Sequence, residues 1–140
     1  QKTAYEIVSR DWSSDVCSSD LAMLSNTPEM VEAHYAVPAL NAVLNTLNTR
    51  LDAHLLAWQM NHCEASVLIT DREFAPVMAQ ALHMLQTEFG RHPLVIDVGD
   101  SEYTGAGERL GTHDYETWIA AHAPLPITIA RIVRSTRPGG

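Results

Sequence analysis

Two short runs of aliphatic and β-branched residues constrain the fold of this 140-residue chain more than any other feature. They are SVLIT at 66–70, which Asp71 follows, and LVIDV at 94–98, which Gly99 follows. Neither run alternates apolar with polar side chains, a pattern typical of strands that are covered on both faces. Both segments are therefore predicted to be buried strands of one sheet.

Two segments before these strands carry helical patterns with clear start signals. Thr27 followed by Pro28 predicts a helix start, because proline at the first helical position loses no hydrogen bond and already has a helical φ. Asp52 is predicted to cap a second helix. The apolar positions of the two helices are three or four residues apart: Met30, Ala33 and Val37, then Ala53, Leu56, Ala57 and Met60. Pro38 predicts a kink near the end of the first helix.

A third helix is predicted between the two buried strands. Pro76 lies near its first turn, and Gly90 is expected to stop it. Its apolar positions are Met78, Ala81, Leu82 and Leu85. Residues 42–44 are predicted to form a short strand, and residues 113–122 a short helix. This alternation predicts parallel βαβ units with right-handed crossovers, hence an α/β fold with an open, mainly parallel sheet and flanking helices.

Residues 1–21 do not share this organisation. They are rich in serine and scattered aspartate, and no apolar period of two or 3.6 residues runs through them. They also lack the basic start, apolar middle and small-residue cleavage site of a secretory signal. The stretches Gln1 to Ile7 and Asp11 to Leu21 resemble the two constant parts of a translated short-read sequencing adapter. We therefore expect residues 1–21, with Cys17, to be an artefactual or disordered tail without evolved chemistry.

Charge and composition exclude several classes of protein. Seventeen acidic against nine basic residues give a net charge of −8, which would repel a nucleic-acid backbone. No run of about 18 apolar residues is present that could span a bilayer. Cys17 and Cys63 lie far apart, so neither a disulfide framework nor a cysteine-rich zinc site is indicated. We expect a cytoplasmic protein without a nucleic-acid partner, while the oligomeric state stays open.

Two groups of adjacent polar residues could carry chemistry, and each has a simpler structural interpretation. Residues 62–64 are His62, Cys63 and Glu64, whose neighbouring side chains near a helix end point in different directions and cannot converge on one metal ion. Residues 71–73 are Asp71, Arg72 and Glu73, and they follow a strand at the edge where open α/β sheets bind ligands. For them a solvated turn with a helix cap is the favoured interpretation.

A glycine-rich acidic loop, residues 99–111, has a spacing similar to that of a nucleotide-binding loop, with glycines at Gly105, Gly107 and Gly111. A bound phosphate would meet nearby carboxylates, and no clear helix opens directly behind the glycines. Those carboxylates are Asp100, Glu102 and Glu108. A flexible surface loop is therefore favoured.

The remaining candidates also have structural interpretations. His113, Asp114 and Glu116 could suggest acid–base chemistry, but no motif places a serine or cysteine nucleophile beside them. His34 is expected on the apolar side of its helix, as a satisfied core histidine. The two tryptophans on predicted helices, Trp58 and Trp118, are expected to be packing anchors. The residues alone thus indicate no catalytic, cofactor-binding or metal-binding side chain.

A resemblance to a known family covers Leu24 to Leu110. It is carried by LSNTPEMVEAHYAVPALNAVLNTLNTRLD at 24–52, EASVLITDREFAP at 64–76 and PLVIDVGDSEYTGAGERL at 93–110. Their order and spacing resemble the early part of the large N-terminal domain of AMP-forming acyl-CoA synthetases, the adenylate-forming superfamily, and best its medium-chain fatty-acid branch. The resemblance implies a flavodoxin-like part of that domain.

The same resemblance implies the chemistry of the parent protein. A fatty or related carboxylic acid reacts with ATP to give acyl-AMP and pyrophosphate, and CoA then displaces AMP, so ATP, Mg²⁺ and CoA are the implied cofactors. The phosphate loop ending in Pro-Lys-Gly, the ribose-binding aspartate motif and the C-terminal domain with its catalytic lysine have no counterpart here, and no lysine follows Lys2. We expect residues 22–123 to be an incomplete domain that binds no cofactor and is inactive alone.

Residues 124–140, PLPITIARIVRSTRPGG, depart from the family pattern because they are suddenly basic. We interpret them as an atypical tail, such as a frameshift would produce. Two other hypotheses stay open. The first is a small flavodoxin-like binding or receiver module with Asp71 or Asp97 at the carboxyl edge of the sheet, although the late lysine of a receiver is absent. The second is a non-catalytic oligomerisation piece.

Overall fold

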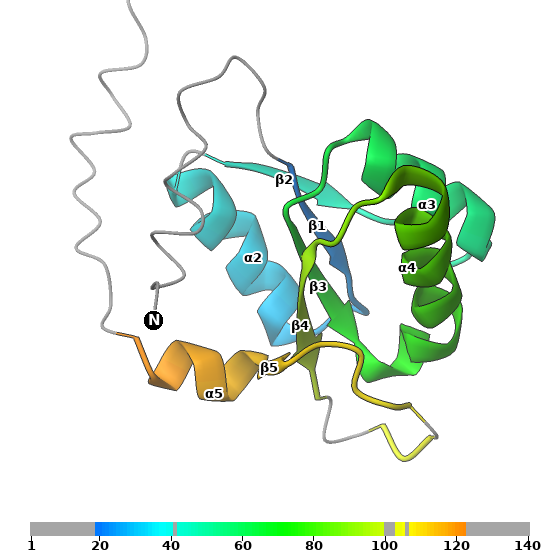
Figure 1. Ribbon diagram of the computed structural model, residues 1–140. Helices are drawn as coiled ribbons and strands as arrows, with labels where there is room; N and C mark the ends of the chain where they lie inside the picture. Colours follow the sequence, from blue (N-terminus) through cyan, green and yellow to red (C-terminus); the bar gives the residue numbers. More distant parts are fainter. Residues whose placement is uncertain (1–18, 41, 100–102, 106, 123–140) are drawn as a thin grey trace, which may run out of the picture.

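The computed structural model describes residues 19–40, 42–99, 103–105 and 107–122, which form three layers with a sheet in the middle (Figure 1). Within these residues the sheet has five strands, all parallel, in the order β2-β1-β3-β4-β5. The strands are β1 (Ser19–Met23), β2 (Val43–Thr46), β3 (Val67–Asp71), β4 (Leu94–Val98) and β5 (His113–Asp114). The predicted open parallel α/β sheet is confirmed, and its strand order is the flavodoxin-like one.

Four α-helices flank this sheet in the described part of the chain. They are α2 (Pro28–Ala39), α3 (Ala53–His62), α4 (Ala75–Phe89) and α5 (Tyr115–Ala120), and the 3₁₀ helix η1 (Arg72–Phe74) precedes α4. Helices α2 and α5 cover one face of the sheet, and α3 and α4 cover the other (Figure 1).

The register of the strands separates the two cores. Residues paired in parallel register point to the same face, and successive residues point to opposite faces. The row toward α3 and α4 consists of Leu21, Leu68 and Val95. The next row faces α2 and α5 and consists of Ala22, Ile69 and Ile96. The sheet is therefore apolar on both faces, which explains why its strands do not alternate in sequence.

Most of the local signals act as the sequence predicts. The Asp52 carboxylate accepts a hydrogen bond from the Leu55 amide at 2.9 Å and caps α3. All four predicted apolar positions of α3 are buried. Helix α4 ends at Gly90, whose φ of 66° lies in the left-handed region that favours glycine. Helix α2 starts after Thr27, but among the described residues the Thr27 hydroxyl has no partner, so it does not act as a side-chain cap.

The ends of three elements differ from the prediction. Strand β1 begins at Ser19, three residues before the predicted start of the domain, because residues 20–23 pair with β3 on one side and residues 19–22 with β2 on the other. Strand β2 extends to Thr46, since Asn45 and Thr46 continue the pairing with β1. Helix α2 runs through Pro38 to Ala39. This proline therefore lies in the last turn, and most of the helix precedes it.

Strand β4 is less buried than predicted. Its first three residues, Leu94 to Ile96, are only half-buried, whereas every residue of β3 is buried. The segment predicted as one helix at 113–122 begins instead with β5, and α5 that follows has only six residues. Within the described residues, α5 contacts β4 on the α2 side, where Leu94 and Ile96 are half-buried.

Candidate functional site

The carboxyl ends of β1 and β3 hold the first group of residues that the sequence singles out. Asp71 ends β3, is 1% exposed, and accepts a hydrogen bond from the Glu73 amide at 2.9 Å. Glu73 accepts a hydrogen bond from the Ser25 hydroxyl at 3.0 Å, just beyond β1. Arg72 donates from Nε and Nη2 to the Gly107 carbonyl oxygen, at 3.2 and 2.8 Å. The predicted cap at Asp71 is confirmed, but the carboxyl is buried and not in a solvated turn.

Asp97 on β4 anchors the same loop from the neighbouring strand. Its side chain is 1% exposed, and its two oxygens accept hydrogen bonds from the Leu110 amide at 3.1 Å and the Gly111 amide at 2.8 Å. Hydrogen bonds from amides to a carboxylate are stronger than bonds between neutral groups. Asp97 therefore holds the loop against the sheet, a role that the sequence did not reveal.

The glycines of this loop are explained by close packing. A Cβ added at Gly107 would collide with the Arg72 carbonyl oxygen, and one added at Gly111 would collide with the Val95 carbonyl oxygen. Residues 107–111 are thus fixed at both ends, and the prediction of a flexible loop is wrong for this part. The other loop candidates are Gly105 and Glu108, which are exposed, and Asp100 and Glu102, which lie outside the described residues.

The three residues at 62–64 contact three different partners. His62 stacks on Trp58, with ring centroids 4.9 Å apart. The Cys63 sulfur accepts a hydrogen bond from the Asn45 amide nitrogen at 3.2 Å. Glu64 pairs with Arg91 at 3.1 Å. Across the described part of the chain, no group of three or more His, Cys, Asp or Glu side chains could hold a metal ion.

Residues 113–116 build the start of α5. Asp114 caps the helix by accepting from the Thr117 amide at 3.1 Å and the Thr117 hydroxyl at 2.8 Å, and it pairs with Arg109 at 2.7 Å. These hydrogen bonds, above all that from the Thr117 hydroxyl, hold the pKa of the Asp114 carboxyl below its usual value. The His113 ring lies 4.3 Å from that of Trp118, and Glu116 is exposed. Asp114 thus has a structural role as a helix cap.

Two predictions about ring side chains are wrong. His34 is exposed, with Nδ1 2.7 Å from the Met30 carbonyl oxygen, because the buried stripe of α2 consists only of Ala33 and Val37. Trp58 is 48% exposed and stacks on His62 at the surface of α3. Helical periodicity located the buried stripe but not its width, so residues beside the stripe were assigned to the core.

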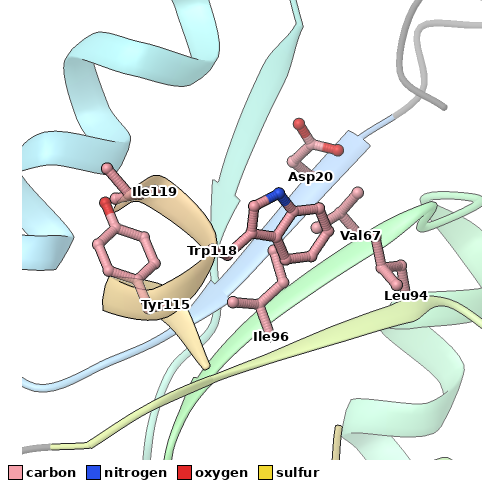
Figure 2. Close-up of a pocket in the computed structure, with 7 residues that line it drawn as sticks. All are labelled: Asp20, Val67, Leu94, Ile96, Tyr115, Trp118 and Ile119. Carbon is pink, nitrogen blue, oxygen red and sulfur yellow. The ribbon is translucent and has the colours of Figure 1, made fainter. Parts of the chain in front are cut away.

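A cavity of about 180 Å³ lies at the amino ends of β1, β3 and β4, under α5 (Figure 2). It is lined by Asp20, Val67, Leu94, Ile96, Tyr115, Trp118 and Ile119. Figure 2 shows the Trp118 ring directed over the sheet, toward Ile96 and Asp20. Trp118 therefore packs as predicted, on the strand side chains beneath α5.

Two ionisable groups of this cavity are perturbed. Burial raises the pKa of the Asp20 carboxyl from 3.8 to about 6, since removal from water disfavours the charged form. Burial also raises the pKa of Tyr115, and so does its hydrogen bond to the Glu32 carboxylate at 2.9 Å. A carboxyl with a raised pKa in a cleft can mark a functional site. Here the Asp20 carboxyl faces aliphatic and aromatic side chains, and Tyr115, the other ionisable residue of the lining, donates its hydroxyl to Glu32, so the cavity shows no catalytic pair.

The described residues define a class of protein with an open, parallel α/β sheet of flavodoxin-like order. Hydrogen bonds hold a loop at the carboxyl edge of this sheet. Residues 21–128 match the family described as AMP-binding enzymes, and the chain belongs to this family. The predicted relationship to acyl-CoA synthetases is thereby confirmed, and the receiver hypothesis is not favoured.

Similar proteins include two enzymes of Arabidopsis thaliana. The chain is 37% identical to a peroxisomal benzoate–CoA ligase over 115 residues, which are 80% of this chain and 19% of that protein. It is also 37% identical to a peroxisomal butyrate–CoA ligase over 112 residues, 78% of this chain and 19% of that protein. The chain thus spans about a fifth of the length of these relatives.

A solved structure supports the fold. A red-emitting luciferase from Phrixothrix hirtus matches with a TM-score of 0.60 and 11% identity, over 89% of this chain and 28% of the luciferase. At this identity the match concerns the fold alone. In the described part of this chain, no helix is long and apolar enough to cross a membrane.

Proposed function

We propose that this chain is the N-terminal scaffold of an AMP-forming acid–CoA ligase. The parent protein would convert ATP, CoA and a carboxylic acid to the acyl-CoA thioester, AMP and pyrophosphate. The observation that carries the proposal is the family match over residues 21–128, together with 37% identity to two proteins named as CoA ligases. Because the named substrates are benzoate and butyrate, the acid is proposed as a small or fatty carboxylic acid.

The geometry supports a scaffold role for these residues. The polar groups at the carboxyl edge are engaged in hydrogen bonds: Arg72 and Asp97 tie the loop to the sheet, and Asp71 caps η1. ATP chemistry needs donors and Mg²⁺ around the phosphates to stabilise developing charge. We therefore assign no contact with ATP, Mg²⁺ or CoA to the described residues, and propose that other parts of the parent supply them.

A chimera tests this proposal. The matching fifth of the Arabidopsis benzoate–CoA ligase is replaced by residues 21–120 of this chain, and benzoate-dependent pyrophosphate release is measured beside the unaltered ligase. We expect the chimera to keep activity, because the replaced part supplies the sheet and not the reacting groups. A folded chimera without activity would count against the proposal.

The purified 140-residue chain gives the complementary measurement. We expect no acid-dependent pyrophosphate release above a heat-killed control, and turnover above that control would contradict the scaffold role.

We also propose a cytoplasmic location for the parent, although both relatives are named as peroxisomal. Imaging of a fluorescent fusion of the parent would distinguish the two compartments.

A further inference from the structure

The cavity beneath α5 has one charged group in an otherwise apolar lining (Figure 2). The strands contribute four residues to the same face of the sheet, which are Asp20, Val67, Leu94 and Ile96. Helix α5 contributes the three residues opposite, which are three or four positions apart and therefore share one side of the helix: Tyr115, Trp118 and Ile119. Any ligand in this cavity therefore meets one carboxyl group and a largely hydrocarbon surface.

The Asp20 carboxyl lacks a counter-charge. It is 6% exposed, and among the described residues it belongs to neither ion pair and to no side-chain hydrogen bond. Its pKa of about 6 leaves it ionised at pH 7.5. An ionised carboxylate that is removed from water without a partner is unfavourable. A bound cation would supply the missing counter-charge.

The size and surroundings of the cavity narrow the class of ligand. Its volume is about 180 Å³, and an apolar cavity of roughly 150 Å³ is enough to hold benzene. The aromatic ring of Trp118 adds a surface that attracts cations. An anion would meet the Asp20 carboxylate and, close by, that of Glu32, which accepts the hydrogen bond from Tyr115. The cavity thus suits a cation with an apolar part no larger than about one ring.

We propose that the cavity beneath α5 binds a small primary ammonium ion that carries one apolar ring or a short apolar chain. The ammonium group donates hydrogen bonds to the Asp20 carboxylate, and the apolar part lies between Trp118 and the aliphatic side chains of the sheet. Asp20 was expected to belong to a tail, but it pairs with strands on both sides of β1 and is a fixed part of the cavity. The inference is independent of the proposed ligase activity, because it assigns no step of that reaction to the cavity.

Calorimetric titration of the full 140-residue chain at pH 7.5 tests the site with two probes. Benzylamine is protonated at this pH, and benzyl alcohol has nearly the same shape without the charge. We expect benzylamine to saturate one site per chain and benzyl alcohol to bind at least tenfold more weakly. This comparison uses only the wild-type chain, so it does not depend on the folding of any variant.

Two variants identify the carboxyl that holds the ammonium group. Asp20→Asn removes the charge but keeps the size of the side chain, and we expect it to weaken benzylamine binding at least tenfold. Glu116→Gln is the matched control, because it removes an exposed carboxylate of α5 that does not line the cavity. It should bind benzylamine like the wild type. Circular dichroism checks that both variants fold.

Nuclear Overhauser effects between ligand and protein locate the bound probe. We expect them between the benzylamine ring and the methyl groups of Val67, Leu94 and Ile96. Contacts only with Trp58, which is 48% exposed on α3, would place the cation at the surface and contradict the proposal. Absence of saturable binding, equal affinity for benzyl alcohol, or equal affinity of Asp20→Asn and the wild type would also overturn it.

Discussion

Replacement of Asp20 by valine should stabilise the protein, and the effect should depend on pH. Asp20 lies in a row of the sheet between Leu44 on β2 and Val67 on β3, and it is only 6% exposed. Its neighbours in this row are aliphatic and give the charged carboxylate no ion pair among the described residues. Valine has the β-branched shape that suits a buried strand.

The magnitude follows from the pKa of Asp20. Burial raises it from 3.8 to about 6, a difference worth about 3 kcal/mol between the charged and neutral forms. Below about pH 4 the carboxyl is neutral in both the folded and the unfolded chain, so folding carries no charge penalty. Between about pH 4 and 6 the unfolded chain releases its proton first, and the free energy of unfolding falls. Above about pH 6 the loss in free energy of unfolding is complete, and it stays constant at higher pH.

Urea denaturation followed by circular dichroism at pH 4 and pH 7.5 measures this effect. We expect Asp20→Val to raise the free energy of unfolding by about 2 kcal/mol more at pH 7.5 than at pH 4, because at pH 4 the unfolded carboxyl is already partly ionised. Asp114→Asn is the control. The pKa of Asp114 is lowered, so the stability that its carboxylate contributes is lost as the pH falls, which is the opposite pH dependence to that of Asp20. An equal gain from Asp20→Val at both pH values, or no gain at pH 7.5, would refute the reasoning.

Three further substitutions test the contacts that hold the loop and α5. Gly111→Ala should lower the free energy of unfolding by about 1–3 kcal/mol, because its Cβ would meet the Val95 carbonyl oxygen; the midpoint of urea denaturation measures this, and an unchanged midpoint would contradict the close packing. Asp97→Asn should cost about 2 kcal/mol and speed proteolysis within residues 107–111, because the amide presents one acceptor where the carboxylate presents two; cleavage at the wild-type rate would argue against the anchor. Tyr115→Phe should lower stability by about 1 kcal/mol through loss of the hydrogen bond to Glu32, as a thermal melt would show, and Glu32→Gln combined with it should add little.

The parts of the fold that were predicted well depend on neighbours in sequence. The buried face of α3, its Asp52 cap and the αL residue Gly90 are all set by residues within about four positions of each other. Strand β3 was located because Val67 to Thr70 form a run of four apolar and β-branched residues, which has few other structures open to it. Local periodicity and capping suffice for such elements.

The parts that were missed depend on contacts between distant residues. Asp97 accepts hydrogen bonds from amides 13 and 14 residues further along, and Arg72 reaches a carbonyl 35 residues away. No spacing rule predicts such pairs. The glycines of the loop therefore resembled a nucleotide-binding motif, whereas close packing of Gly107 on η1 and of Gly111 on β4 explains them. The half-buried state of Leu94 and Ile96 in β4 was also missed, because on their side of the sheet it depends on the length of a helix that follows β5.

Position 20 shows how a strand tolerates a side chain that does not suit its place in the sheet. The fold places Leu21 in the core and Asp20 in an aliphatic row, so β1 includes residues that were expected to belong to the tail. Pairing in a sheet needs only backbone groups, which any residue except proline supplies. The side chain must still match its row, and an aspartate there costs up to about 3 kcal/mol at neutral pH. The response to Asp20→Val therefore measures how much a mismatched side chain takes from the stability of a strand whose backbone pairing is intact.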